Sequence, residues 1–426
     1  MKTKEWKDTE IGRIPKDWEV KPLGEVFETF PTPSYSRDQL SSDGEIRYLH
    51  YGDIHTRFGS VVDVSETKFP TISSQQVRKY KSLCDGDVIM ADASEDYEGC
   101  GHAIAVQNIG DTKLIAGLHT IPLRKKIEVF EGSYVGYMFA GSLVKKQIER
   151  QAVGTKVYSI SYKSISDCFL VIPPPREQQR IAKALSDIDM LITSLDKAIE
   201  KKRMVKQGAM QQLLTGKKRL KGFTEGWKIK RIGDIGYTYN GLTGKSKGDF
   251  GVGTAHYVTF LNILNNPIID TALLEKVNVA LNEKQNEVRK GDLFFNTSSE
   301  TPEEVGICAT IDVDIDELYL NSFCFGFRLT DRDILSDYLA YYFRSSIGRQ
   351  MMTMLAQGAT RYNLSKDNFL KCRLLLPGSL VEQQAIIDVL SIMDGEISSI
   401  THEREKYLRL KEGMMQELLT GKTRLI

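Results

Sequence analysis

A search for residues with the right types and spacing to do chemistry finds few candidates. Phe250–Gly253 holds two glycines, but it lacks the spacing of a dinucleotide-binding loop and precedes a strand-like run, so a plain loop is expected. Asp312–Asp316 alternates aspartates as a calcium loop does, yet Glu317 and Phe323 stand where that loop needs Gly and Glu. We therefore expect an exposed strand there and no metal site.

Histidines and cysteines also lack the spacing of metal ligands. His50 and His55 could share a loop, but neither a carboxylate cluster nor a thiolate cluster accompanies them. The six cysteines show no C-x-x-C pair, which is typical of reduced structural thiols in a cytoplasmic protein. A P-loop and a serine nucleophile elbow are absent from the sequence. We predict a protein that is not an enzyme, with no catalytic residues, no metal and no cofactor.

Basic, hydroxyl and aromatic residues are a stronger signal, because they recur at matching places in the two halves of the chain. Lys, Arg, Ser and Thr can hold phosphates, while Tyr and Arg can reach base edges. Such loops are more often simply solvated, so the prediction rests on their repetition. The candidate DNA-binding residues are Ser34, Tyr35, Ser36, Arg37, Thr155, Lys156 and Tyr158 in the first half, and Thr243, Lys245, Lys247, Thr360, Arg361 and Tyr362 in the second.

These candidates belong to a chain that repeats itself. Glu177–Leu220 returns as Glu382–Leu425, 205 residues further on and without a gap. Upstream, Ala152–Ser161 matches Ala356–Ser365 at a distance of 204 residues. Further matching pairs are Gly86-Asp87 with Gly291-Asp292, and Trp18 with Trp227. A self-match this long indicates one unit written twice, a globular part followed by a long helix.

The repeated segments have the apolar spacing of a coiled-coil interface, in alternating steps of four and three residues. Prolines before each segment block an upstream extension of the helix, while Gly216 and Gly421 suit the residue after a helix end. Arg404 replaces the sixth apolar position of the second helix. The predicted interface consists of Ile181, Leu185, Ile188, Ile192, Leu195 and Ile199 in the first helix, and Ile386, Leu390, Met393, Ile397 and Ile400 in the second.

The globular parts favour short strands, because apolar residues mostly alternate between Gly and Asp turns. Helices are expected over 134–152 and 338–356, where aromatic residues recur every three or four positions. We predict an α+β protein with two mixed α/β domains, 1–172 and 221–376, each followed by a long helical segment, 173–220 and 377–426. The helices should form an antiparallel coiled coil with internal pseudo-twofold, circular symmetry, which would bring the last residues, Arg424–Ile426, near the segment Trp6–Trp18.

Length and charge are consistent with this organisation. A chain of 426 residues is too long for a single core. Its formal net charge of +1 argues neither for nor against nucleic acid, so a DNA surface would be a local patch or shared with a partner. The sequence has no apolar run long enough to span a membrane and no secretory signal, so we expect a cytoplasmic protein without membrane contact.

The chain resembles the DNA specificity (S) subunits of type I restriction–modification systems. The resemblance lies in Lys7–Val20, in Val171–Leu185 with the following LLTGK, and in the second copy from Leu374. It implies two target recognition domains that each read half of a bipartite double-stranded DNA site, with the helices as a ruler. It also implies two methyltransferase (M) subunits that supply the S-adenosylmethionine site, and restriction (R) subunits that cleave.

Two other functions remain open at this point. The chain could be a protein-interaction scaffold, whose helices and globular parts bind other proteins. It could also be a self-contained restriction–modification enzyme, which the missing cofactor and nuclease motifs disfavour.

Overall fold

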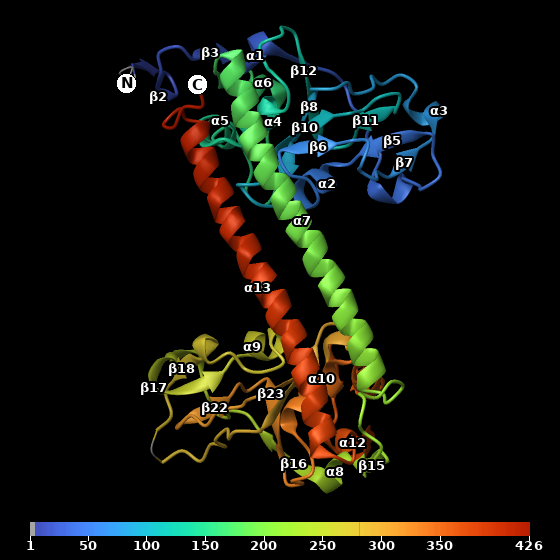
Figure 1. Ribbon diagram of the computed structural model, residues 1–426. Helices are drawn as coiled ribbons and strands as arrows, with labels where there is room; N and C mark the ends of the chain where they lie inside the picture. Colours follow the sequence, from blue (N-terminus) through green and yellow to red (C-terminus); the bar gives the residue numbers. More distant parts are fainter. Residues whose placement is uncertain (1–4, 281) are drawn as a thin grey trace. The chain divides into compact units, whose positions relative to one another are not determined.

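The computed structural model describes residues 5–280 and 282–426. By internal contacts the chain divides into two compact units. The first unit holds the residues up to Leu195 together with Glu403–Ile426, and the second unit holds Asp196–His402. Each unit contains one globular part and a segment of each of two long helices, α7 (Pro175–Leu213) and α13 (Leu380–Leu418) (Figure 1).

The globular part of the first unit is built on a five-stranded sheet in the order β4-β12-β8-β10-β6, beside a three-stranded sheet in the order β11-β5-β7. Smaller antiparallel pairs are β1-β2, β13-β9 and β14-β3. The strands are β1 Trp6–Thr9, β2 Gly12–Pro15, β3 Glu19–Pro22, β4 Phe27–Thr29, β5 Ile46–Leu49, β6 Val61–Asp63, β7 Thr71–Ile72, β8 Val88–Ala91, β9 Ala93–Ser94, β10 Ala103–Gln107, β11 Leu114–Ala116, β12 Thr120–Lys125, β13 Tyr158–Ser159 and β14 Phe169–Ile172.

The globular part of the second unit repeats this plan with a four-stranded sheet, β16-β23-β19-β21, and a three-stranded sheet, β18-β17-β22. The pair β15-β26 and a small three-stranded sheet, β20-β25-β24, complete it. The strands are β15 Lys228–Arg231, β16 Gly236–Asn240, β17 Phe250–Val258, β18 Glu275–Val277, β19 Leu293–Asn296, β20 Ser298–Ser299, β21 Cys308–Thr310, β22 Leu318–Leu320, β23 Cys324–Leu329, β24 Ala356–Gln357, β25 Tyr362–Leu364 and β26 Arg373–Leu376.

Short helices cover these sheets, and Gly136 lets α4 (Tyr134–Ala140) approach the first unit's sheet closely. A β-carbon at Gly136 would lie 2.2 Å from the carbonyl oxygen of Ser60, so α4 can pack directly on the sheet. The short helices are α1 Leu23–Val26, η1 Arg37–Gln39, α2 Tyr51–Thr56, α3 Ser74–Val77, α4 Tyr134–Ala140, α5 Ser142–Glu149 and α6 Tyr162–Ile165, then α8 Ile232–Ile235, η2 Lys247–Asp249, α9 Phe260–Asn265, η3 Thr271–Leu273, η4 Pro302–Glu304, α10 Ser336–Arg344, α11 Ser346–Leu355 and α12 Lys366–Lys371.

Three local predictions were wrong. The single helix expected over 134–152 is broken at Gly141, and its counterpart over 338–356 is broken at Ser345, because both residues adopt extended backbone angles. Phe250–Gly253 belongs to β17 and not to a loop, since a bulge between Phe250 and Ala255 absorbs the glycines within the strand. Asp312–Asp316 forms a turn region before β22 and not a strand.

The long helices begin and end where the sequence places their boundaries. Each has 39 residues; α7 starts at Pro175, and α13 starts shortly after Pro377. Beyond their ends, Gly216 and Gly421 adopt φ values of 70° and 71°, which suit glycine best. Both boundaries therefore follow from local backbone preferences.

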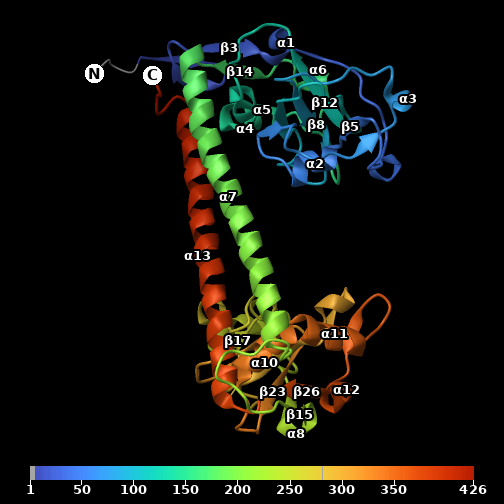
Figure 2. The ribbon, with the colours of Figure 1, turned by 45° about the vertical axis from the view of Figure 1, so that its right-hand side comes forward.

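Within each unit the two helical segments pack on one another and run antiparallel. In the first unit, α7 residues Ile181 and Leu185 share a core cluster with Leu418 of α13, and Lys411 pairs with Asp189 at 2.5 Å. Figure 1 and Figure 2 both show the end of α13 beside the start of α7. In the second unit the order is reversed, and α7 residues Met210 and Leu213 pack with Ile386 and Leu390, while Lys202 pairs with Glu396 at 2.6 Å.

The predicted interface positions differ in how deeply they are buried. Those of the first helix are buried, apart from the partly buried Leu195. In the second helix, Ile386 and Leu390 are buried, whereas Met393, Ile397 and Ile400 are partly buried. The apolar spacing therefore identified the inward face of both helices, and burial is weaker toward the middle of α13.

Candidate nucleic-acid interface

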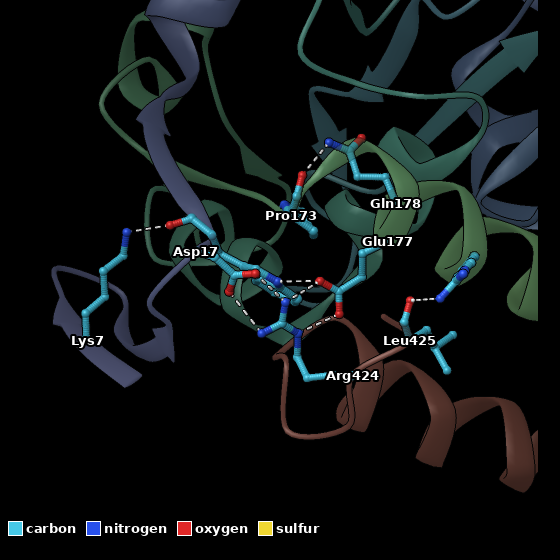
Figure 3. Close-up of polar contacts among 9 residues, drawn as sticks. Lys7, Asp17, Pro173, Glu177, Gln178, Arg424 and Leu425 are labelled. Carbon is cyan, nitrogen blue, oxygen red and sulfur yellow. Dashed lines mark hydrogen bonds and ion pairs between the residues drawn. The ribbon is translucent and has the colours of Figure 1, made fainter. Parts of the chain in front are cut away.

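In the first unit, a buried carboxylate joins the start of α7 to both ends of the chain. Glu177 accepts two hydrogen bonds from Arg424, each of 2.7 Å, and one of 2.9 Å from Nε1 of Trp18. Arg424 also donates to both carboxylate oxygens of Asp17, at 2.9 and 2.7 Å, which lowers the pKa of Asp17 (Figure 3). The predicted approach of the C-terminal segment to the Trp18 region is confirmed.

The second unit builds the same junction with the equivalent residues. Arg219 donates two hydrogen bonds, of 2.8 and 2.7 Å, to the fully buried Glu382, and Nε1 of Trp227 lies 3.4 Å from the same carboxylate. Here the chain continues from Arg219 to Trp227 without a break. Gly226 precedes the tryptophan, so the second carboxylate of the first junction has no counterpart.

The glutamine after each buried glutamate holds a neighbouring loop. The side chain of Gln178 accepts from the backbone N–H of Glu131 and donates to the carbonyl of Pro173. Gln383 accepts from the backbone N–H of Leu335 and donates to the carbonyl of Pro377 in the same way. The repeated Glu-Gln pair is therefore a structural anchor in both units.

A second repeated framework lies within the sheets. Asp87 accepts from Nε and Nη2 of Arg124 at 3.0 and 2.6 Å, and the arginine lies over the ring of Phe30. Asp292 accepts from Arg328 in the same manner, at 2.8 and 2.6 Å. In the second unit, Tyr239 takes the place of Phe30, and its hydroxyl donates a further hydrogen bond of 2.7 Å to Asp292.

The loops that follow α5 and α11 hold six of the thirteen predicted DNA-binding residues. Gly154 and Gly358 adopt φ values of 153° and 145°, and each loop then enters a short strand, β13 or β25, that pairs with β9 or β20. Thr155, Lys156, Thr360 and Arg361 are exposed at the loop tips, and Tyr158 and Tyr362 are partly buried. The structure therefore brings each set to an equivalent place in its own unit.

Of the predicted residues near η1, three contact other residues of the first unit: Tyr35, Ser36 and Arg37. Ser36 caps η1 together with Gln39, and the hydroxyl of Tyr35 donates to the carbonyl of Gln76. Ser34 is exposed. Arg37 is exposed as well and pairs with the buried carboxylate of Asp53 at 2.8 Å.

The corresponding residues of the second unit lie around η2. Ser246 caps η2 as Ser36 caps η1, which places Lys247 at the position of Arg37. Lys247 is exposed, whereas the side chain of Lys245 is only 3% exposed and pairs with Glu283 at 2.5 Å. The backbone of Thr243 donates to Gln285. Lys245 would have to leave its carboxylate before it could bind a phosphate.

Sequence reasoning missed a group of aromatic and titratable residues around α2. The ring of Tyr51 lies edge-on to His119, with the ring centres 5.3 Å apart, and Nδ1 of His119 lies 3.1 Å from Asp92. Asp92 leads into β9, the strand that pairs with Tyr158, so this group adjoins the loop that carries Lys156. Together, Arg37, Tyr51, His119 and Lys156 form what we call the first patch.

The equivalent surface of the second unit has a different chemistry. Phe260 begins α9 as Tyr51 begins α2, and Phe323 takes the place of His119 with 60% of its surface exposed. Together with Lys247 and Arg361 they form the second patch. The alignment of Tyr48 with Tyr257, continued by three residues, would have identified Tyr51 and Phe260.

The first patch rests on the buried His50 and the half-buried His102. Burial lowers the pKa of His50, and the nearby Arg37 lowers it further. Burial also lowers the pKa of His102, assisted by His55. Nδ1 of His50 accepts a hydrogen bond from the backbone N–H of Gly52, an arrangement that needs the neutral imidazole. Burial raises the pKa of Asp92.

The described residues provide neither a metal-binding cluster nor a membrane-spanning helix. In 5–280 and 282–426, no group of three or more His, Cys, Asp or Glu side chains could hold a metal ion. Within the same ranges, none of the helices combines the length and the apolar character needed to cross a membrane. The six cysteines are free thiols.

Comparison with known proteins identifies the family. The model of the type I restriction modification DNA specificity domain matches twice, over residues 15–202 and 224–409. This chain belongs to that family. It is 26% identical over 452 aligned positions to the MjaX relative of Methanocaldococcus jannaschii, and the match covers 100% of this chain and 98% of the relative.

Named specificity subunits match along most of the chain. The MjaVIII specificity subunit of the same organism is 24% identical, over 97% of this chain and 94% of its own. The EcoKI specificity subunit of Escherichia coli K12 is 21% identical, over 88% and 82%. The prediction of a non-catalytic specificity subunit is therefore confirmed by the family.

Solved structures of type I systems share the fold of this specificity-domain protein. The S subunit from M. genitalium aligns with a TM-score of 0.55 at 13% identity, covering 94% of this chain and 96% of its own. A chain from a study of complex assembly and conformational transition in a type I system aligns with a TM-score of 0.58 at 15% identity, covering 96% and 99%. Each copy of the specificity domain contains one of the two patches.

Proposed function

We propose that this chain is the sequence-specific DNA-binding subunit of a type I restriction–modification enzyme. Its target recognition domains, 1–172 and 221–376, each read one half of an asymmetric bipartite site in double-stranded DNA. The DNA-binding residues predicted from the sequence, with Tyr51 and His119 added in the first patch and Phe260 and Phe323 in the second, supply the contacts.

The observation that carries this proposal is a repeated framework with unlike surfaces. The junctions at Glu177 and Glu382 and the Asp–Arg pairs of the sheets are nearly the same in both units. The four side chains that define each patch differ at every equivalent position, whereas the neighbouring Thr155 and Tyr158 recur as Thr360 and Tyr362. A framework that is kept while its outer side chains change is suited to reading two different sequences with one architecture.

The long helices, 173–220 and 377–426, are proposed to form one continuous antiparallel coiled coil that sets the spacer between the half-sites. The apolar faces of both helices and their antiparallel packing within each unit support this. Inserting one heptad into each helix adds about 10 Å of length. We expect the spacer of the recognised site to lengthen by a few base pairs, and an unchanged spacer would refute the ruler.

Two methyltransferase subunits are proposed as partners, because the two units present equivalent junctions that can dock the same protein twice. The methyltransferase supplies the S-adenosylmethionine site and part of the phosphate-binding surface, in keeping with the net charge of +1. Restriction subunits add cleavage. A cytoplasmic location, where such a complex meets chromosomal DNA, is part of the same proposal.

Genome-wide methylation mapping tests the function. The chain is expressed with its methyltransferase partner in a host that lacks other methylation, and the partner expressed alone is the control. We expect one bipartite, non-palindromic motif that depends on the chain. A protein-interaction scaffold would leave methylation unchanged, whereas methylation by the purified chain alone would point to a self-contained enzyme.

A further inference from the structure

We propose that Arg37 reads a guanine in the half-site contacted by the first unit, and that Asp53 positions its guanidinium for this purpose. The inference rests on the proposed function and names the residue and the base. Asp53 is a positioning residue, because it acts only through Arg37.

Asp53 is a buried carboxylate shared by two arginines. It is 1% exposed, and its Oδ1 atom lies 2.8 Å from Nη2 of Arg37 and 3.1 Å from Nη1 of Arg57. Its Oδ2 atom is buried and has no hydrogen-bond partner among the described residues. One arginine is enough to balance this charge, so the second arginine is available for another role.

The two arginines differ in what else they contact. Arg57 donates from Nη2 to the carbonyl of Lys68 at 2.9 Å and lies over the ring of Phe58, so it is built into the structure. Arg37 is 54% exposed, and within 5–280 and 282–426 Asp53 is the one residue with which it forms an ion pair. The remaining N–H groups of its guanidinium face solvent and can bind a ligand.

The position of Arg37 places it within the first patch. A β-carbon at Gly52 would lie 3.8 Å from Nη2 of Arg37 and 3.3 Å from Nδ1 of His50, so the guanidinium lies against the first turn of α2. Tyr51 belongs to the same turn, and its ring contacts His119. Arg37 is therefore adjacent to the side chains expected to meet bases.

A fixed, planar guanidinium is suited to a base more than to a phosphate. Guanine presents O6 and N7 in the major groove as two acceptors that match a pair of arginine N–H groups. This match is favoured when the guanidinium is held in place in advance, and the contact of Nη2 with Asp53 anchors one end of the group. Phosphate also accepts paired N–H groups from arginine, but it is an anion, so the negative charge of Asp53 beside Arg37 disfavours a phosphate more than a neutral guanine.

The second unit lacks this arrangement. Asn262 takes the place of Asp53, and its side chain amide is bonded to the backbone of Asp270 and to Asn266. Lys247 takes the place of Arg37, and lysine lacks the rigid, planar pair of N–H groups that arginine offers. The half-site of the second unit is therefore read by other means.

The test compares Arg37→Lys, Arg37→Ala and Asp53→Asn with the wild-type chain, each with the methyltransferase partner. Arg57→Lys is the matched control, because Arg57 shares the same carboxylate but is also held by the carbonyl of Lys68 and lies over the ring of Phe58. Methylation mapping gives the motif of each variant. Competition binding then uses duplex oligonucleotides in which each G·C pair of the motif is replaced in turn by A·T, at several salt concentrations.

For the wild-type chain we expect one G·C pair in one half-site whose replacement weakens binding by roughly ten-fold to a hundred-fold. Arg37→Lys should reduce this discrimination to about three-fold at that pair alone, because it keeps the charge and loses the paired contact. Asp53→Asn should reduce it in the same direction, and Arg57→Lys should keep the motif. The other half-site should be unchanged in all variants.

Two results would overturn the inference while the proposed function stands. The first is full discrimination at every G·C pair in Arg37→Lys. The second is an equal loss of affinity for all sequences in Arg37→Ala, with a salt dependence reduced by about one ion, which identifies a phosphate contact. A wild-type chain with no sequence preference would instead overturn the proposed function and the inference with it.

Discussion

The two units share their internal ion pairs and differ in the surfaces around α2 and α9. Arg424, Glu177 and Trp18 of the first unit have direct counterparts in Arg219, Glu382 and Trp227 of the second. The outer positions have changed from Tyr51 and His119 to Phe260 and Phe323, among others. A buried polar residue must keep its hydrogen-bond partner, so both partners are retained in the two units. An exposed residue has no such requirement, so its type can differ between the units and suit a different ligand.

The largest difference in stability between the two units is expected when the junctions are mutated. Arg424→Ala leaves Glu177 buried without its cation, and we expect it to cost the first unit about 3 kcal/mol of stability. The second-unit variant Arg219→Ala should cost less, because the chain there continues through the junction and Arg219 pairs with one carboxylate, Glu382, among residues 5–280 and 282–426. Hydrogen exchange of the C-terminal segment and of 213–227, with urea unfolding, measures both. Equal losses of stability in the two variants would show that the continuous peptide from Arg219 to Trp227 contributes nothing to the second junction.

A smaller difference in stability is expected beside the Asp–Arg pairs of the sheets, where Tyr239 of the second unit stands in the place of Phe30. Tyr239→Phe removes the hydroxyl that donates to Asp292 and makes the second unit resemble the first. We expect a loss of about 1.5 kcal/mol, since the hydrogen bond goes to a charged, buried acceptor. Hydrogen exchange of β19 reports it, and Phe30→Tyr is the reciprocal control, expected to increase protection of β8. A variant with unchanged protection would mean that Arg328 alone satisfies Asp292.

The smallest expected difference is in the response to pH. Burial lowers the pKa of His50 and of His102, so the unfolded chain takes up protons first as the pH falls. Their contribution to stability is complete above about 6.5 and is lost as the pH falls through the lowered values. Asp92, with its raised pKa, acts in the opposite sense at more acidic pH.

We therefore expect the first unit to lose more protection than the second between pH 7.5 and 5.5. The second unit contains His256 and His402, neither of which is buried. Hydrogen exchange of β8 and β19, corrected for the intrinsic rate, measures the difference. His50→Asn keeps a cap on α2 and removes one titrating group, so it should reduce the loss. A second unit that loses as much as the first would contradict this assignment.

The sequence by itself determined the features that depend on neighbours along the chain. Prolines marked the starts of both long helices and glycines marked their ends, because these residues restrict or permit particular backbone angles wherever they occur. The long, gapless self-match indicated the duplication, and the spacing of apolar residues predicted which face of each helix points inward. Arg37 was among the predicted site residues for its chemical type, and its possible role as a DNA contact stays a proposal.

Only the tertiary structure decided which residues meet across long distances in the sequence. Asp92, His119 and Tyr51 form one group because a strand and a helix bring them together, and Arg37 is linked to Asp53 for the same reason. The breaks at Gly141 and Ser345 and the strand through Phe250–Gly253 were likewise set by packing against neighbouring elements. Local preference is worth a fraction of a kcal/mol per residue, and burial against a partner outweighs it.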